Sequence, residues 1–471
     1  MGDEVSRENF SASDYRRFAE RLDAEMAFVR ELFANDAFDN STNCLGYELE
    51  LCLVKPDGSP APGNREVLDA TNNPLLTVEL ARYNLEINGH PFSLSSDVFE
   101  RIEQDLDGLF AEVESQATRL NYQVGLFGVL PSVRSEHLDP AHFMSDLHRY
   151  HQLNDRLIEM RGQPVRVVIH GEEHLCAERN DVMLEALGTS LQVHLQVPYN
   201  HAVDAYHAAL WASVLMVGVG ANSPLVLGHS CWHESRIAIF KQSVDTRNPQ
   251  EMRDSIVPRV HLSKGYIESF LELFEDNAYY SPILPELFDA PVDELRHFSL
   301  HNGTIWRWVR PILGKRDGGY HLRLELRVVP SGPTLVDSMA NLVFYIGLVE
   351  GLRARGDELT RVLYPTLEHE FYEVARHGMN SEIGWFNGRM GAVQEIVLQQ
   401  ALPIAAGGIR ALGIDHAERW LEVIRQRVES GQTGANWSRW HWAAHGDSNR
   451  LVRDYLANAA SGEPVHRWPK P

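Results

Sequence analysis

The segment Leu45 to Val54 alternates apolar and other residues, and this alternation constrains the fold more than any other feature of the sequence. Read as a β-strand, it has one wholly apolar face formed by Leu45, Tyr47, Leu49, Leu51 and Leu53. Glu48 and Glu50 then share the opposite face. Like charges at this spacing repel unless a cation or a proton holds them together. The strand is therefore predicted to carry a metal-binding face.

Two later segments alternate in the same way. The polar face of Leu191 to Val197 carries Gln192, His194 and Gln196. The polar face of Leu322 to Val328 carries Arg323, Glu325 and Arg327. Chance alternation rarely places charged or amide residues on a single face three times, so we interpret the shared pattern as functional.

Two more carboxylates lie in the segment Leu75 to Asn88, which contains Glu79 and Glu86. They are an odd number of residues apart, so on one straight strand they would face opposite ways. A turn or bulge near Arg82 is needed to bring them together. Without it, the pair would be two solvated carboxylates.

Helical periodicity occupies much of the remaining sequence. The expected helices begin near Ser13, Ser96, Pro140 and Ala202, with Ser13 capping the first and Ser95 or Ser96 the second. The Pro140 helix is expected to reach about Met160. Val124 to Leu130 is a predicted strand, Val165 to His170 is predicted to be a short buried strand, and the sequence after Pro333 is predicted to be mainly helical.

Strands scattered among helices do not give the regular βαβ order of a parallel sheet, so the predicted class is α+β. Strands with one polar and one apolar face suit an antiparallel sheet that is covered by helices on one side and open on the other. We expect residues 1–340 to form the catalytic region and residues 341–471 a mainly helical region packed on the same domain.

The charge of the chain limits its partners. With 65 acidic and 43 basic residues its formal net charge is -22, which argues against nucleic acid or an anionic membrane. A phosphate-bearing small substrate remains possible where divalent cations and local arginines supply positive charge. The apolar run from Ala208 to Ala221 is too short to span a bilayer and is better interpreted as a buried helix.

The cysteines favour a reducing compartment. The four of them form no C-x-x-C pair and are sparse for 471 residues, so no disulfide is expected. The stretch Met1 to Ser6 has neither the basic nor the apolar region of a secretory signal. We expect a cytoplasmic protein.

Together, the polar faces offer carboxylate oxygens and one imidazole, from Glu48, Glu50, Glu79, Glu86, His194 and Glu325. Mg²⁺ prefers carboxylate ligands, and Mn²⁺ tolerates an added histidine. Two such ions could bridge the phosphates of ATP, with Gln192 and Gln196 beside them. Arg327, two residues from Glu325, would be placed to neutralise a phosphoryl group in transfer.

Each of these residues also has a structural interpretation. A lone histidine such as His194 is more often hydrogen-bonded within the fold, and Arg327 beside Glu325 could be an ordinary ion pair. Aromatic clusters near a C-terminus more often dock that segment than bind a ligand, which applies to Trp437, Trp440 and Trp442. No standard zinc site has the spacing of His229, Cys231 and His233.

Several short blocks, taken in order, resemble glutamate-cysteine ligase family 2 of the carboxylate-amine ligases, in the glutamine synthetase superfamily. The blocks are Gly46–Glu50, Val78–Leu80, Leu85–Asn88, Gly128–Ser132, Thr189–Val197, Ala221–Pro224, Ser235-Arg236, Gly303–Trp306, Arg310-Pro311 and Leu324–Arg327. They span about residues 44 to 335. The C-terminal third matches loosely, chiefly at Thr433–Trp437.

The resemblance implies a glutamine-synthetase-like catalytic fold and an ATP-dependent ligase. Such an enzyme phosphorylates the side-chain carboxylate of glutamate, and an amine then displaces phosphate. The implied ligands of one Mg²⁺ or Mn²⁺ ion are Glu50, Glu79 and Glu86, and those of a second are Glu48, His194 and Glu325. The residues implied at the ATP phosphates or the acyl phosphate are Arg310 and Arg327, with Arg236 at the substrate carboxylate or the nucleotide.

The residues leave other functions open. A two-metal hydrolase could use the same carboxylates, and a catalytically silent module could retain ATP and metal. Under each hypothesis the expected partners are small molecules, here ATP, glutamate or a similar carboxylate, and an amine; a homo-oligomer is possible. Cysteine gives the family its name, and the sequence does not identify the amine.

Overall fold

The structure is a computed structural model that describes residues 4–40, 44–316 and 318–471. Of the stretch Met1 to Ser6 discussed above, the first three residues lie outside this range. All four cysteines are free thiols, as expected.

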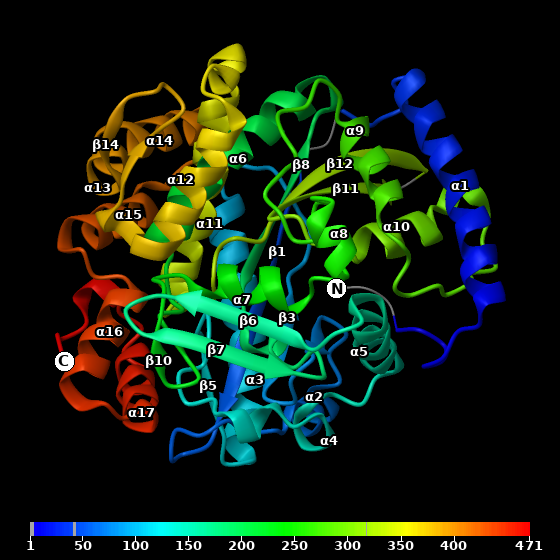
Figure 1. Ribbon diagram of the computed structural model, residues 1–471. Helices are drawn as coiled ribbons and strands as arrows, with labels where there is room; N and C mark the ends of the chain where they lie inside the picture. Colours follow the sequence, from blue (N-terminus) through cyan, green and yellow to red (C-terminus); the bar gives the residue numbers. More distant parts are fainter. Residues whose placement is uncertain (1–3, 41–43, 317) are drawn as a thin grey trace.

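One antiparallel sheet forms the centre of the protein (Figure 1), with the strand order β11-β12-β8-β1-β3-β2. Its strands are β1 Cys44–Val54, β2 Leu76–Val78, β3 Asn84–Asn88, β8 Leu191–Val197, β11 Val309–Arg316 and β12 Gly319–Leu326. Two short strands, β4 Phe92–Ser93 and β5 Gln123–Gly125, also pair with β1. The predicted α+β class and the antiparallel sheet are confirmed, and the three alternating segments become β1, β8 and β12.

Two parts of the sheet differ from the prediction. The strand expected over Val124 to Leu130 is reduced to β5. Strand β11 was not predicted, because Pro311 and Gly314 interrupt its β propensity. Its position explains the proline: β11 lies at the edge of the sheet, where a missing N–H costs no ladder hydrogen bond.

Helices cover the apolar face of the sheet. Helix α6 (Ala202–Val219) packs on β11 and β12, and α11 (Leu335–Arg353) packs on β8. The helical segment Tyr199–Val219 and α11 are long and apolar enough to cross a membrane, but 89% and 78% of their most apolar windows are buried inside the protein. They are core helices, as the buried-helix interpretation of Ala208 to Ala221 predicted for the first.

The N-terminal helices begin at different residues from those predicted. Helix α1 (Ala12–Ala34) is capped by Ser11 rather than Ser13, because Ser11 and Asp14 exchange hydrogen bonds in a capping box. Helix α3 (Val98–Arg119) follows Asp97 without a side-chain cap. The nearby Ser95 hydroxyl donates to the Asp97 carboxylate instead of capping the helix.

The helix predicted from Pro140 to Met160 is two helices, α4 (Pro140–Phe143) and α5 (His148–Arg161). The break lies where the chain pairs with the turn after β2. There the Ser145 N–H donates to the Leu80 carbonyl and the Arg82 N–H donates to the Phe143 carbonyl. These tertiary hydrogen bonds replace helical ones and set the direction of α5.

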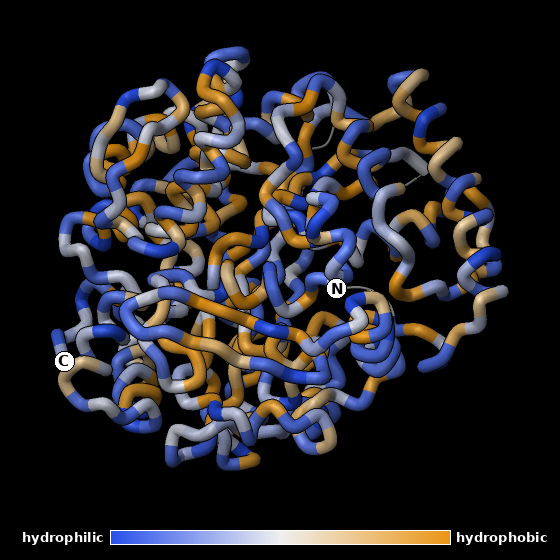
Figure 2. Tube along the Cα trace, in the orientation of Figure 1, coloured by the Kyte–Doolittle hydropathy of each residue, from blue (hydrophilic) through white to orange (hydrophobic). Residues whose placement is uncertain are grey.

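Strands β6 (Val165–His170) and β7 (His174–Arg179) form a separate hairpin in front of α7 (Ser235–Ser243), visible in Figure 1. Only alternate residues of β6 are buried, so this predicted strand has one exposed face. The hydropathy colouring in Figure 2 shows the same mixture along the hairpin.

The remaining α-helices and strands up to residue 303 are short, namely α2 Asn64–Thr71, β9 Leu225–Val226, β10 His229–Ser230, α8 Pro249–Arg253, α9 Leu271–Glu275 and α10 Arg296–Gly303.

The C-terminal region is mainly helical, as predicted, with one short hairpin of β13 (Glu382–Gly384) and β14 (Met390–Ala392). Its helices are α12 Tyr364–His377, α13 Val393–Ile396, α14 Leu402–Ala411, α15 Glu418–Ser430, α16 Gly434–His445 and α17 Ser448–Ala459. Helices α14 and α15 pack on α11, and α17 lies beside β5. The division at residue 340 stays a prediction; α11 runs continuously across that position.

The end of the chain is tied to the core. The buried Asp337 at the start of α11 accepts hydrogen bonds from the Arg427 guanidinium, at 2.8 Å, and from the Val465 N–H, at 3.0 Å. The Trp437 indole donates to the Pro469 carbonyl, and its ring meets Trp468 edge-on. Trp437 thus docks the C-terminal segment, the role favoured for the tryptophan cluster.

His207 in α6 makes the stability of the fold depend on pH. It is 5% exposed, its Nε2 accepts a hydrogen bond from the Ile267 N–H, and burial lowers its pKa to about 4. An unfolded histidine has a pKa near 6.5, so the unfolded state binds the proton more readily. The stability from neutral His207 is complete above about pH 6.5 and is lost as the pH falls towards 4.

We therefore expect His207→Gln, whose carbonyl oxygen can still accept from Ile267, to flatten the fall of melting temperature between about pH 6.5 and pH 4.5. A difference of up to roughly 2 kcal/mol across this window follows from the shift. Thermal unfolding at a series of pH values measures it. Equal slopes for the variant and the wild type would contradict the assignment.

Candidate active site

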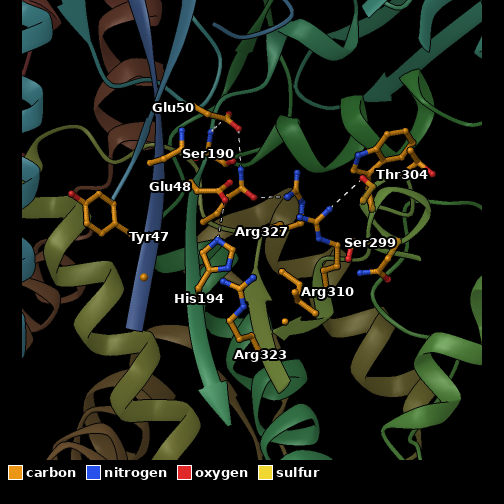
Figure 3. Close-up of a pocket in the computed structure, with 18 of the residues that line it drawn as sticks. Tyr47, Glu48, Glu50, Ser190, His194, Ser299, Thr304, Arg310, Arg323 and Arg327 are labelled. Atoms are coloured by element: carbon orange, nitrogen blue, oxygen red, sulfur yellow. Dashed lines mark hydrogen bonds and ion pairs between the residues drawn. The ribbon is translucent and has the colours of Figure 1, made fainter. Parts of the chain in front are cut away.

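A cavity of about 660 Å³ lies on the polar face of the sheet. Side chains of β1, β8, β11 and β12 line it, together with residues of α5, α7 and the segment 298–308. In Figure 3, Glu48, His194 and Arg327 point towards one another, whereas Tyr47 lies on the other side of β1. The two faces predicted for β1 are therefore confirmed.

The first carboxylate cluster consists of Glu50, Glu79 and Glu86, which offer ligand oxygens within 4.8 Å of one another. The β1–β3 register places Glu50 opposite Glu86. Glu79 joins them because the chain turns between Val78 and Asn84, as the odd spacing required. The turn is closed by the Glu79 N–H, which donates to the Asn84 carbonyl at 3.3 Å.

The second cluster consists of Glu48, His194 and Glu325, also with ligand atoms within 4.8 Å of one another. His194 pairs with Gly46 of β1 on one side and with Glu325 of β12 on the other. Its Nε2 lies 3.1 Å from Glu48 Oε1 and donates to it. The register of three adjacent strands builds this cluster.

Two arginines hold Glu325, which is fully buried. Arg310 lies opposite it on β11 and donates from Nε to Oε2 at 2.5 Å, and Arg327 donates from Nη1 to Oε1 at 2.5 Å. The ion pair that the sequence suggested between Arg327 and Glu325 is therefore present, and its carboxylate is at the same time a member of the second cluster.

Gln192 connects the two clusters. Its amide nitrogen donates to Glu50 at 3.2 Å, and its carbonyl oxygen accepts from Arg327. Glu50 also accepts a hydrogen bond of 2.6 Å from the Ser190 N–H. Gln192 is 1% exposed, so its two hydrogen bonds fix the relative positions of a carboxylate and an arginine from different clusters.

The two clusters differ in their electrostatics. Burial raises the pKa of Glu79 well above its usual range, with Glu86 and Glu50 adding to the effect, and burial raises the pKa of Glu86 to about 8. Burial acts in the same direction on Glu325, but Arg310 and Arg327 outweigh it and hold the pKa of Glu325 at about 2. The first cluster therefore needs positive charge, whereas the second is already partly neutralised.

The donor sets fit divalent cations that take oxygen ligands. Three carboxylates, or two with an imidazole, are typical ligands of Mg²⁺ and Mn²⁺. In these clusters, the buried atoms Glu79 Oε1 and His194 Nδ1 have no hydrogen-bond partner among the described residues. A cation in the first cluster would also offset the repulsion among its carboxylates.

The remaining candidate residues also line the cavity. Arg236, at the start of α7, pairs with Glu234 at 3.4 Å, donates to the Arg327 carbonyl at 2.8 Å and lies over the Trp308 ring. Gln196 is 3% exposed and lies beside Arg323 in the β8–β12 register. The residues proposed from the sequence thus line one cavity, except for the fully buried Glu86 and Glu325, which complete the two clusters behind its wall.

Several lining residues were not proposed as site residues, among them Arg149, Glu185, Trp306 and Arg323. Arg323 lies on the polar face of β12, so the alternation that revealed Glu325 could have identified it. Arg149 and Glu185 come from α5 and from a short 3-10 helix, and no local pattern marked them.

The described residues contain no third group of three close metal-ligating side chains. His229, Cys231 and His233 do not form such a group. Burial raises the pKa of the Cys231 thiol to about 12, which disfavours the thiolate that zinc requires.

Comparisons with known proteins identify the family and agree with the fold. The model of glutamate-cysteine ligase family 2 matches residues 44–454. A solved glutamate–cysteine ligase from Francisella tularensis, in complex with AMP, is similar in fold, with a TM-score of 0.56 at 12% identity; the similarity covers 92% of this chain and 91% of that one.

A bifunctional glutathione synthetase from Pasteurella multocida is similar at a TM-score of 0.47 and 12% identity, covering 89% of this chain and 53% of that one. No curated protein matches the sequence. The identities are low, so the structural likeness establishes the fold alone.

Glu79→Gln tests the repulsion in the first cluster. Without divalent ions, at about pH 8, we expect the melting temperature to rise by about 1–3 °C, because one of three mutually repelling buried carboxylates is lost. Added Mg²⁺ or Mn²⁺ should stabilise the variant less than the wild type.

Thermal unfolding with and without a chelator measures both effects. Glu178→Gln, at an exposed position on β7, is the matched control and should change neither. A clear loss of stability in the metal-free Glu79 variant would instead identify Glu79 as a structural residue.

Proposed function

The chain belongs to glutamate-cysteine ligase family 2 and is an ATP-dependent carbon–nitrogen ligase, and on that premise we propose that it joins the γ-carboxylate of glutamate to an amine through an acyl phosphate. The observation that carries the proposal is the placement of two carboxylate clusters in one cavity, with Arg310 and Arg327 at the second cluster and Gln192 between the two. A phosphoryl group in transfer needs cations on several sides, which such a site can supply.

Two Mg²⁺ or Mn²⁺ ions are part of the proposal. Glu50, Glu79 and Glu86 would hold one ion, and the second would be held by Glu48, His194 and Glu325. When bound, the ions would neutralise phosphate charge and orient the phosphates.

The protein's own residues have distinct parts in this proposal. Arg310 and Arg327 donate hydrogen bonds to the transferred phosphoryl group, and Glu325 holds both guanidinium groups in place between turnovers. Gln192 keeps Arg327 in register with Glu50. Arg236, with its guanidinium fixed by Glu234 and Trp308, forms part of the wall near the substrate carboxylate.

The reaction proceeds in two balanced steps. A glutamate γ-carboxylate oxygen attacks the γ-phosphorus of ATP, and the bond to the bridging oxygen breaks and releases ADP. The neutral amine nitrogen then attacks the acyl carbon as the C–O bond to phosphate breaks. One proton leaves the ammonium ion before attack and a second leaves nitrogen afterwards; phosphate takes up one, and solvent the other.

ADP release tests the proposal. Purified protein with ATP, Mg²⁺ and glutamate should release ADP at a rate that an amine increases, and the γ-glutamyl amide should appear in equal amount. Phosphate release that needs no carboxylate would favour a two-metal hydrolase. Tight ATP binding without turnover would identify a silent binding module.

Glu48→Gln should lower amine-dependent ADP release by roughly a hundredfold or more, because a neutral amide is a poor ligand and a poor partner for His194. The side chain is 14% exposed at the cavity, so the melting temperature should change little. Glu178→Gln again serves as the control. Wild-type turnover in the Glu48 variant would overturn the assignment of the second cluster.

A further inference from the structure

Glu185 adds a fourth carboxylate at the end of the cavity that holds Glu50, Glu79 and Glu86. It begins a 3-10 helix, Glu185–Leu187, and its side chain lines the cavity. The Asn84 amide donates to the Ala186 carbonyl at 2.9 Å and so fixes this short helix beside β3. No described residue donates a hydrogen bond to the Glu185 carboxylate, so it is available to a ligand.

Glu185 lies outside both proposed metal sites. The nearby charges that act on it are those of Glu50, Arg327 and Arg149. Glu50 repels the negative charge of Glu185, and the two cations are shared with other groups: Arg327 is held by Glu325 and Gln192, and Arg149 also acts on Glu79 and Glu86. A cationic ligand at this end would meet a carboxylate that the fold has left without a hydrogen bond.

Apolar side chains also line the cavity. Leu153 is one of them and lies on α5, one turn after Arg149; the Tyr150 hydroxyl places that helix against the Val78 carbonyl, next to Glu79. Phe240 of α7, one turn after Arg236, is another. The Phe240 ring meets that of Trp306 edge-on at 6.1 Å.

The segment that carries Glu185 lies close to Arg236. A Cβ atom on Gly188 would lie 2.8 Å from the Arg236 side chain, so the segment carrying Glu185 packs directly on α7. Glu185 and Phe240 therefore belong to the same corner of the cavity.

We propose that this corner binds the acceptor of the ligase reaction, and that the acceptor is a cationic primary amine with an apolar body. This inference rests on the proposed function and specifies its amine. Glu185 pairs with the ammonium group, and Leu153, Phe240 and Trp306 contact the hydrocarbon part. Glu185 acts here as a residue that determines specificity.

Other acceptors fit this corner less well. Ammonia would leave the apolar wall without a contact. A zwitterionic amino acid such as cysteine would bring its own carboxylate next to four others, while Arg236 is already paired with Glu234. Burying apolar surface favours an amine whose hydrocarbon part fills the corner.

The first experiment compares acceptors. With saturating ATP, Mg²⁺ and glutamate, kcat/KM for ADP release is measured with phenethylamine, isopentylamine, ethylamine, ammonium and cysteine. The two larger apolar amines should exceed ethylamine, ammonium and cysteine by about tenfold or more. Equal or higher kcat/KM for ammonium or cysteine would overturn the proposal.

The second experiment uses Glu185→Gln, which keeps the shape of the side chain and removes its charge. We expect KM for phenethylamine to rise about tenfold or more, with KM for ATP and glutamate within about twofold of the wild type. Glu178→Gln is the control. A rise in KM for glutamate in place of the amine would show that Glu185 serves the other substrate and would overturn its assignment.

A third variant keeps the proposal testable if Glu185→Gln fails to fold. Leu153→Ser should lower kcat/KM for phenethylamine about five- to tenfold more than it lowers kcat/KM for ethylamine. Equal losses for both amines would show that Leu153 does not contact the apolar body.

Hydroxylamine separates this inference from the proposed function. It is small and mainly uncharged at neutral pH, so it can trap an acyl phosphate without pairing with Glu185. γ-Glutamyl hydroxamate formation in both the wild type and Glu185→Gln, with no preference for apolar amines, would uphold the ligase and refute the acceptor. No hydroxamate in the wild type would refute both.

Discussion

The pairing register of β1 with β8 is the constraint on which the rest of this structure depends. Leu49 lies opposite Leu191 and Glu48 opposite Gln192, so the apolar and polar residues of both strands share their faces. A slip of one residue would turn Glu48 and Glu50 towards α6 and α11 and expose leucines to the cavity. The packing of the core thus determines which side chains meet in the active site, because the same alternation serves both faces.

Burying several carboxylates in this arrangement is electrostatically unfavourable, and the two clusters differ in how their charge is balanced. Glu325 is paired with two arginines inside the protein, so its negative charge is stabilised without a ligand. Glu50, Glu79 and Glu86 repel one another, and this mutual repulsion favours any cation that enters. The difference fits a site in which the second cluster keeps its geometry in the free enzyme and the first cluster is completed when a cation binds.

Much of the site could be predicted because the alternation of apolar and polar residues along a strand shows which side chains share a face. All six proposed metal ligands lie on or beside strands whose alternation, or whose required turn, was recognisable.

The same approach missed β11, where a proline and a glycine interrupt the pattern. It placed the first helix cap at Ser13 because the periodicity does not distinguish Ser13 from Ser11. It joined α4 and α5 because the break depends on hydrogen bonds to Leu80 and Arg82, which are remote in sequence. Arg149 and Glu185 could not be found, since they reach the cavity through the docking of α5 and of the segment before β8.

The ties between α11 and the end of the chain affect how this protein is synthesised. Asp337 must receive both Arg427 and the Val465 N–H to be fully paired, and Trp437 packs against Trp468. Helix α11 also supports β8, which carries His194. The sheet formed by the early strands therefore lacks part of its support until residues near 465 have left the ribosome. Helices α6 and α11 can cover the apolar face of the sheet before these residues are made, whereas the buried Asp337 gains Arg427 and the Val465 N–H only when the chain is nearly complete.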